Sequence, residues 1–412
     1  AFDVTLEGNV GNNSAQLLVQ YLNARKEQGV YMGVMADLRR HGIRMKVFPE
    51  HPTLVYRPFT VNKNNYIYLA DNGRIHANLD LHDEQGTGLS FYTNREDTIA
   101  KQDMTVELSR INLKEFRRIL PYMPDMEGWI GAEAHYIDSG PYMMVSSDLR
   151  IDEFKYEGSA LGNWELGGVY LPGEAKDHHL DAYIRHDGEE IAHLGGIYLP
   201  AEEGTGSLSA DIAFEHFPLN VANPFVPDRM VELDGDIDGT LSMKGDPAKP
   251  LLNGELALDS VTFFMPEMSA MFRFDNEPVQ VVNSKMMFKE FDIFTKGKTP
   301  FTINGEVDFS DLERTAVNLK MHAENYELLN APRTKRAMVY GKMYVDFNAT
   351  LRGPVEELVM RGNMNILGKT NVTYVLKDSP LTVNDRLGDM VTFVNFNDTT
   401  SVEESSVRGI CC

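Results

Sequence analysis

VYGKMYVDFNATL, residues 339–351, alternates apolar or small residues with more polar ones without a break. One set is Val339, Gly341, Met343, Val345, Phe347, Ala349 and Leu351, and the other is Tyr340, Lys342, Tyr344, Asp346, Asn348 and Thr350. Because successive side chains of a β-strand point to opposite faces, this spacing predicts a strand with one apolar face and one wet face.

The same alternation recurs along the chain. It appears in Phe301, Ile303, Gly305, Val307 and Phe309; Val317, Leu319, Met321 and Ala323; Ile237, Leu241 and Met243; Leu208, Ala210, Ile212 and Phe214; Met360, Gly362, Met364 and Ile366; and Ile75, Ala77, Leu79 and Leu81. Strands of parallel α/β sheets are buried on both faces and read as continuous apolar runs, which these segments are not. The sequence therefore predicts an all-β fold that is mainly antiparallel.

Helical patterns are few and short. Ser14 is a candidate N-cap for a helix near residues 14–28, with Leu17, Leu18 and Tyr21 on its apolar face. Asn112 similarly precedes a segment from Leu113 to Leu120 that Pro121 would end. We expect only a few short helices beside the strands.

Landmarks recur with a period of about 107 residues. They are Leu108, Phe214 and Met321; then Gly128, Gly235 and Gly341; then Leu149, Leu256 and Met364, each with an apolar residue two positions on. The predicted division is the end of a preceding repeat in 1–100, units in 101–206 and 207–313, an incomplete unit in 314–396, and a disordered or artefactual tail in 397–412. We expect this chain to be part of a longer protein.

Charge and cysteine content exclude several classes of function. The formal net charge is -22, which repels phosphate backbones and anionic headgroups, so nucleic acid is not an expected partner. The only cysteines, Cys411 and Cys412, are adjacent at the end, so neither a disulfide framework nor a cysteine zinc site is available. No apolar run has the length of a membrane span.

No catalytic or metal-binding constellation is convincing. Asp234, Asp236 and Asp238 resemble the start of a calcium loop, but Gly245 stands where the bidentate acid is needed. His178, His179, His186 and His193 are close in sequence without a helical i, i+4 pair, and a solvated surface explains them better. We expect no enzyme activity, no metal and no cofactor.

The apolar strand faces must be covered by something. One possibility is a set of β-sandwiches whose inner faces cover each other. The other is one continuous sheet curled into a gutter, whose apolar concave face would need an apolar ligand. Methionines on these faces, such as Met243, Met321, Met343, Met360 and Met364, suit a surface that fits variable ligands, although methionine also fills gaps in cores.

Residues 208–268 follow a recognisable order. A strand ends at Phe214, Leu233-Asp234-Gly235 and Gly239 follow, and a turn at Gly245-Asp246-Pro247 leads into Pro250-Leu251-Leu252-Asn253-Gly254-Glu255-Leu256. Residues 352–366 repeat part of this order with Gly353-Pro354, Leu358 and Gly362, but lack the proline before the leucine. In the first unit Gly140-Pro141 and Leu149 remain, whereas Ser147 stands in place of the glycine. This order resembles the TamB family of AsmA-like proteins.

The resemblance implies an elongated sheet forming a β-taco, or repeating β-groove, around an apolar channel. It implies transport of phospholipids or other lipids between the inner and outer membranes of a diderm bacterium, contributing to outer-membrane biogenesis. It also implies a periplasmic body, an inner-membrane anchor absent from this chain, phospholipid acyl chains as ligands, and an outer-membrane barrel partner of the TamA/BamA type. A scaffold for outer-membrane protein assembly or secretion, and a structural or adhesive repeat protein with a closed core, remain alternatives.

The residues expected to line the groove are the apolar members of the alternating strands. They are Leu208, Ile212, Phe214, Ile237, Leu241, Met243, Leu256, Leu258, Phe301, Ile303, Val307, Phe309, Val317, Leu319, Met321, Met343, Val345, Phe347, Leu351, Met360, Met364 and Ile366. In an open groove, Val345→Asp or Ile303→Asp should block lipid passage and spare the fold, whereas a packed core would unfold.

Overall fold

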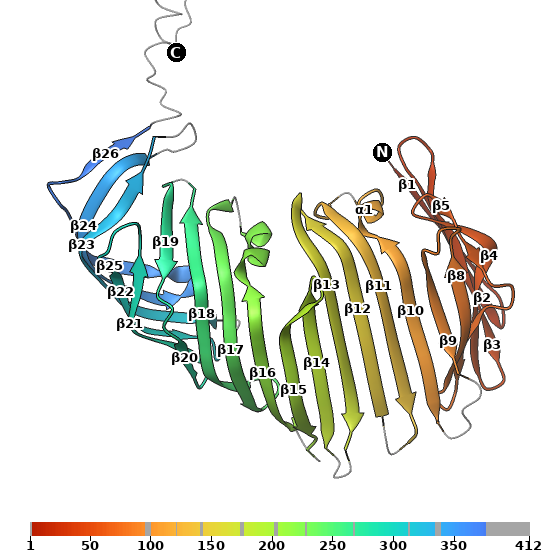
Figure 1. The fold of residues 1–412 in the computed structure, drawn as a ribbon. Coiled ribbons are helices and arrows are strands. Elements are labelled where there is room, and N and C mark those ends of the chain that lie inside the picture. The colour runs from red at the N-terminus through yellow and green to blue at the C-terminus, as the bar shows by residue number, and fades with distance from the viewer. Residues whose placement is uncertain are drawn as a thin grey trace, which may run out of the picture.

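The computed structural model describes residues 2–94, 100–120, 122–140, 143–173, 177–201, 205–226, 229–266, 268–311, 314–333 and 339–375. The predicted tail of residues 397–412, with Cys411 and Cys412, lies outside these ranges. The described residues form one long antiparallel sheet of 26 strands with short helices at its margins, which confirms the all-β prediction (Figure 1).

The strands follow one another across the sheet nearly in chain order. The N-terminal part holds β1 Asp3–Val10, β2 Ser14–Leu22, β3 Gln28–Arg39, β4 Gly42–Leu54, β5 Arg57–Pro58, β6 Thr60–Val61, β7 Tyr66–Ala70, β8 Ile75–His82 and β9 Gly88–Thr93. The central part holds β10 Gln102–Asn112, α1 Leu113–Phe116, β11 Met126–Asp138, β12 Met143–Tyr156, β13 Ser159–Pro172, β14 His178–His186, β15 Glu189–Leu199, β16 Ser207–Pro218, η1 Leu219–Phe225 and β17 Glu232–Gly245.

The C-terminal part continues the same sheet. It holds β18 Leu251–Met265, β19 Ala270–Phe274, β20 Val279–Val282, β21 Lys285–Phe294, β22 Phe301–Asp308, β23 Ala316–Ala331, β24 Val339–Pro354, η4 Val355–Glu357, β25 Val359–Ile366 and β26 Asn371–Tyr374. Two short strands share an edge at two places: β19 and β20 both pair with β18, and β25 and β26 both pair with β24.

The predicted helix near residues 14–28 is wrong. Ser14–Leu22 is strand β2, and β3 begins at Gln28. Ala15, Leu17, Val19 and Tyr21 alternate along β2, which pairs with β1 on one side and β3 on the other. Pairing on both sides overrides the weak helical pattern of a short segment.

The segment after Asn112 is helical, as expected, but shorter. The Asn112 side chain accepts a hydrogen bond from the Lys114 N–H (3.0 Å), and the α-helix covers only Leu113–Phe116. Turn hydrogen bonds continue to Leu120, whose N–H donates to the Phe116 carbonyl (2.8 Å).

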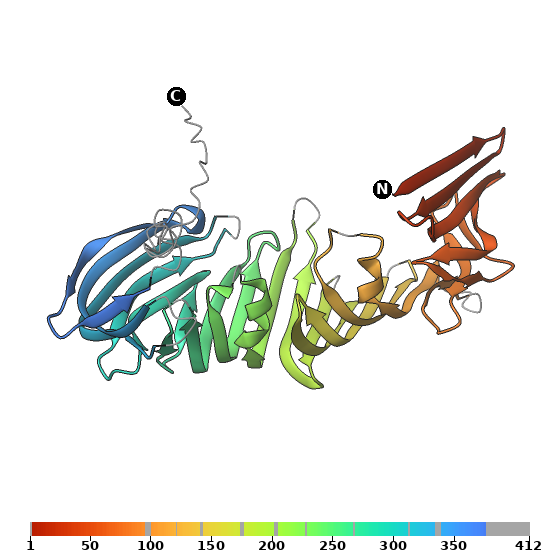
Figure 2. The same cartoon turned by 90° about the horizontal axis from the view of Figure 1, so that it is seen from above.

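β-bulges bend the long strands. In β10, β16 and β23 the register shifts at Arg110, His216 and Asn325, which have φ of 49°, 49° and 50°. Each bulge adds a residue to one strand and increases its local twist. Seen from above, the sheet bends so that its two ends turn toward the same side (Figure 2).

Buried apolar clusters lie at the two ends of this curved sheet. At the N-terminal end Phe59, Val61, Leu79 and Leu81 form one cluster. At the C-terminal end two clusters are built around Phe272, Phe291 and Leu329, and around Ala323, Tyr326 and Val345. Among the described residues, none of these clusters includes a residue between Phe91 and Leu258, so the central strands have no core of comparable size.

The landmarks of the sequence repeat occupy corresponding places in long strands. Gly128, Gly235 and Gly341 all have positive φ, at 134°, 99° and 115°. At Gly235 a Cβ would lie 2.7 Å from the Val261 Cα, so only glycine fits there. Division of the chain at residues 101, 207 and 314 stays a prediction.

Candidate functional site

Register partners place apolar side chains on one face of the sheet from strand to strand. One such row, the apolar file, crosses the strands from β9 to β18 and ends on β20. It runs through Leu89, Leu108, Ala132, Leu149, Leu166, Ile184, Ala192, Phe214, Gly239, Leu256 and Val279. With neighbouring strands about 4.8 Å apart, ten steps give the apolar file a length of roughly 48 Å.

The apolar file is only partly covered in the central strands. Leu108 and Leu166 keep 36% and 38% of their surface exposed although they stand on the concave face. Val106 and Met143, on the same face, are exposed to a similar degree. A face this long and this apolar exceeds what a monomer normally leaves to water, and such patches mark interaction sites.

At the C-terminal end the concave face closes around a cavity of about 330 Å³. Its wall comes from strands far apart in the sheet, with Phe263 and Phe272 on one side and Val345, Phe347 and Met364 on the other. Tyr326 also lines it, and burial raises the pKa of this tyrosine. The lining side chains are otherwise hydrocarbon or thioether, so the cavity suits an apolar ligand.

At the N-terminal end a second cavity, of about 420 Å³, lies between the sheet and α1. Met32, Phe59, Leu81 and Leu89 line it from the sheet, and Phe116, Ile119 and Leu120 line it from α1 and the turn that follows.

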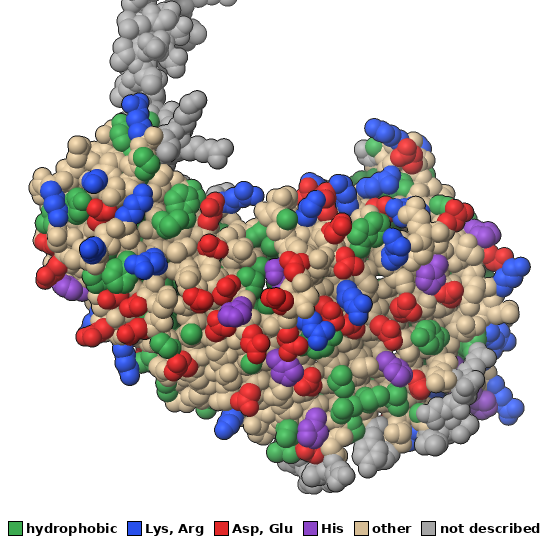
Figure 3. Space-filling view, viewed as in Figure 1, with side chains coloured by type: hydrophobic (Ala, Val, Ile, Leu, Met, Phe, Trp, Pro, Cys, Tyr) green, Lys and Arg blue, Asp and Glu red, His purple; other side chains and the backbone are tan. Residues whose placement is uncertain are grey.

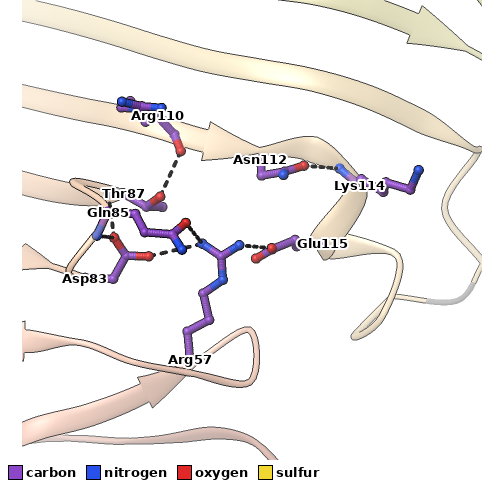
Figure 4. A network of polar contacts seen from close by, with 8 residues as sticks. All are labelled: Arg57, Asp83, Gln85, Thr87, Arg110, Asn112, Lys114 and Glu115. Atoms are coloured by element: carbon purple, nitrogen blue, oxygen red, sulfur yellow. Dashed lines mark hydrogen bonds and ion pairs between the residues drawn. The ribbon is translucent and has the colours of Figure 1, made fainter.

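A polar network lies at the margin of this N-terminal cavity (Figure 4). Arg57 donates to Asp83 Oδ2 (3.1 Å) and to Gln85 Oε1 (3.2 Å), and it also donates to Glu115 on α1. Burial of Asp83 opposes ionisation, but hydrogen bonds from the Thr87 and Gln85 N–H groups and from Arg57 hold its pKa below the usual range. The Asp83 carboxylate therefore stays charged and keeps Arg57 in place.

The opposite, convex face is polar. Tyr183 donates to Glu165 (2.9 Å), Arg185 pairs with Glu165 (3.3 Å), and His135 lies 2.8 Å from Asp103. Figure 3 shows acidic, basic and histidine side chains spread over the face seen there, with hydrophobic ones between them and a small hydrophobic group near the lower edge. The sheet thus has one wet face and one apolar face.

The structure brings the predicted groove residues together on the concave face. All of them except Phe309 lie in strands whose register puts them on the apolar side, and Phe301, Met321, Val345, Phe347, Met360 and Met364 line the C-terminal cavity. Phe309 follows the last residue of β22, and its N–H donates to the Ser284 carbonyl (3.0 Å). Their role in binding a ligand remains a proposal.

Sequence reasoning missed the N-terminal half of this face. Leu108, Ala132, Leu149, Leu166 and Ile184 belong to the same apolar file but were outside the predicted site. Alternation in Ile75, Ala77, Leu79 and Leu81 was a signal that the face extends this far. In the C-terminal cavity, Ala270, Phe272 and Phe274 of the short strand β19 also alternate and went unnoticed.

The two metal-like patterns have structural explanations. Asp238 Oδ1 accepts the N–H of the bulge residue His216 (2.8 Å), so this aspartate supports the bend of β16. His178 stacks on Tyr170 with ring centroids 5.0 Å apart, whereas His193 lies 3.1 Å from Glu190. Within the described ranges, no three His, Cys, Asp or Glu side chains gather in a way that could hold a metal ion.

Taken together, one curved antiparallel sheet with an apolar concave face defines a β-groove protein. Residues 290–408 match the family described as the TamB C-terminal domain. On this all-β antiparallel chain the match, which covers less than a third of the residues, supports membership of the TamB family. Comparison with curated proteins and with solved structures returns no match.

The TamB family has a known cellular location and a general role. TamB proteins belong to the cell envelope, where they act in transport or assembly, and they are associated with TamA-type barrel proteins; they are not known as enzymes. In the described part of the chain, every helix is too short or too polar to cross a bilayer.

Proposed function

We propose that this protein carries phospholipids, or other acyl lipids, between the inner and outer membranes along its concave face, without enzymatic activity. The observation that carries the proposal is the apolar file, which continues from strand to strand and is only partly covered in the central part of the sheet. Acyl chains would lie along it while headgroups project into water from the open side.

The size of the face supports this proposal. A bilayer core is about 30 Å thick, so one acyl chain covers roughly half of that. The apolar file is about three times longer than one chain, at roughly 48 Å by strand spacing. Moving a lipid along it keeps each methylene out of water, which is worth about 0.8 kcal/mol per methylene.

The test needs a position that is exposed rather than packed. Val345 is only 2% exposed and belongs to a buried cluster, so an aspartate there would unfold this end of the sheet instead of reporting on lipid. Ile303 packs against the neighbouring cluster and has the same defect. Val345→Asp and Ile303→Asp are therefore expected to destabilise the fold, and they cannot test whether lipid moves along an open groove.

Leu166 and Leu171 of β13 provide a matched pair. They are 38% and 39% exposed, but Leu166 stands on the apolar file and Leu171 pairs with His179 on the convex face. We expect Leu166→Asp to remove lipid that co-purifies with the wild-type chain, as measured by native mass spectrometry and lipid extraction, and Leu171→Asp to retain it. Equal lipid content in both variants, or a lipid-free wild-type chain, would contradict the proposal.

A role in barrel assembly is favoured by a different observation. Strand β25 is exposed along its whole length, so its outer backbone edge can pair with a strand of another protein. A TamA- or BamA-type barrel partner would be captured by crosslinking from Arg361 or Asn363 of this edge. Crosslinks only from concave-face positions would argue against strand pairing.

A further inference from the structure

The segment 113–120, here called the strap, lies at the margin of the concave face near its N-terminal end. It comprises α1 and the turn up to Leu120, and connects toward β11. Phe116, Ile119 and Leu120 close the 420 Å³ cavity from the side opposite the sheet. A ligand in this cavity would therefore lie between the sheet and the strap, unlike a ligand on the open central strands.

The strap is joined to the turn between β4 and β5. Glu115 accepts from Arg57, the Arg118 guanidinium lies 4.4 Å from the centre of the Tyr56 ring, and the Tyr56 hydroxyl donates to the Arg118 carbonyl (3.3 Å). In the sheet, β4 and β10 are separated by β7, β8 and β9. These contacts consequently span the groove and form an arch over it.

Three of the four cations in the arch already have a carboxylate partner, and the fourth, Arg118, lies over the Tyr56 ring. Arg57 is shared by Asp83 and Glu115, Lys114 pairs with Glu127, and Arg117 lies 2.9 Å from Asp125. The cavity beneath is lined mainly by apolar side chains, with Arg57, Thr87, Asn112 and Glu115 as its polar members, and its volume is in the range of small-molecule sites. This lining fits a hydrocarbon tail.

We propose that the N-terminal cavity is a site for one acyl chain of a lipid, covered on one side by the strap, and that the strap is a gate which a headgroup passes only when the Arg57–Glu115 ion pair opens. The proposal rests on the lipid-carrying function above. The Arg57 and Glu115 side chains keep 24% and 19% of their surface exposed, so water reaches the ion pair and weakens it, and the apolar contacts of Phe116 and Ile119 favour reclosure.

The test compares Glu115, which joins the strap to Arg57, with Glu127 of β11, which joins the strap to the neighbouring strand through Lys114. Glu115→Ala removes the tie to Arg57, whereas the control Glu127→Ala removes the tie of Lys114 to β11 and leaves the arch intact. A photo-crosslinking residue at Leu89 reports lipid under the strap, and one at Met364 reports lipid at the C-terminal cavity. The probe is vesicles of phosphatidylethanolamine and phosphatidylglycerol.

We expect Glu115→Ala to raise the rate of lipid labelling at Leu89 about threefold to tenfold and to leave the rate at Met364 unchanged. The Glu127→Ala control should label at the wild-type rate at both positions. Hydrogen exchange of amides 116–120 should quicken in Glu115→Ala alone. Unchanged exchange would show that the ion pair does not hold the strap, and faster exchange with unchanged labelling would show that the strap is no barrier. Either result overturns the gate, whereas absence of labelling at both positions would instead overturn the lipid-carrying function.

Discussion

Single side chains hold the bends of this sheet. At four bulges the N–H of a residue with positive φ is accepted by an Asn or Asp side chain of the next strand. The pairs are Glu153 with Asn163, His216 with Asp238, Glu290 with Asn304, and Asn325 with Asp346. A bulged N–H has lost its ladder partner, and the amide or carboxylate replaces it. Asn and Asp therefore recur on the convex face because they accept hydrogen bonds from the backbone N–H groups of the bulges.

Replacing one of these acceptors should loosen its bulge. Asp238→Ala is expected to lower local stability around β16 by about 1 to 2 kcal/mol, because the His216 N–H loses a charged acceptor. Asp236→Ala, on the same strand, should change it by less than about 0.5 kcal/mol. Hydrogen exchange of β16 and β17 measures both, and added calcium should alter neither; a calcium-dependent protection would restore the metal interpretation.

A buried carboxylate gives the C-terminal end a dependence on pH. Glu327 is 8% exposed; burial opposes its ionisation, but hydrogen bonds from Tyr344 (2.6 Å) and Asn330 (2.7 Å) hold its pKa below the usual range.

The pKa of Glu327 is lower in the folded state than in the unfolded state, where it is about 4.3. Ionised Glu327 therefore stabilises the fold fully above the unfolded-state pKa, and this stabilisation is lost as the pH falls through the folded-state pKa. Thermal unfolding followed from pH 7 to pH 3 should show a steeper acid loss for wild type than for Glu327→Gln. Parallel curves would mean that Glu327 does not contribute.

At the scale of elements, alternation along single strands was enough to predict most of the fold. Residues 339–351 and 301–308 form strands whose apolar and polar members point to opposite faces, as the alternation predicts. The strand at Ser14–Leu22 was not predicted, since pairing with β1 and β3 decides it and pairing is not a property of one segment. The closed ends and the strap were also out of reach, because they depend on bulges and on contacts such as Arg57 with Glu115.

A glycine allows adjacent strands to approach closely beside the bulge of β21. Gly305 of β22 has φ of 138°, and a Cβ would lie 2.1 Å from the Asn318 carbonyl oxygen on β23. We expect Gly305→Ala to destabilise the C-terminal end by about 2 to 3 kcal/mol through backbone strain and displacement of β23. Gly131→Ala of β11, where the nearest atom is 3.8 Å away, should be close to neutral. Thermal unfolding compares the two, and equal losses would exclude the steric explanation.

At the scale of the whole molecule, stability and function are distributed unequally along the sheet. The two ends have buried clusters, whereas the central strands keep the apolar file open. Elements of a long sheet contact mainly their neighbours, so one region can open without the other. A carrier needs this division, because a packed centre would leave no room for a ligand and open ends would leave the sheet without a core.

The division can be tested with one core substitution. Val345→Asp places an unpaired charge in the cluster of Ala323 and Tyr326, and should abolish amide protection across β21 to β24. Protection of β8 and β9, which pack on the distant cluster of Phe59 and Leu79, should stay at the wild-type level. Val355→Asp, at a position 51% exposed, serves as the control and should change neither end. Hydrogen exchange by mass spectrometry resolves both regions in one experiment. Simultaneous loss of protection at both ends would mean that the sheet unfolds as a single unit, and an open centre would then have to be stabilised by its ligand.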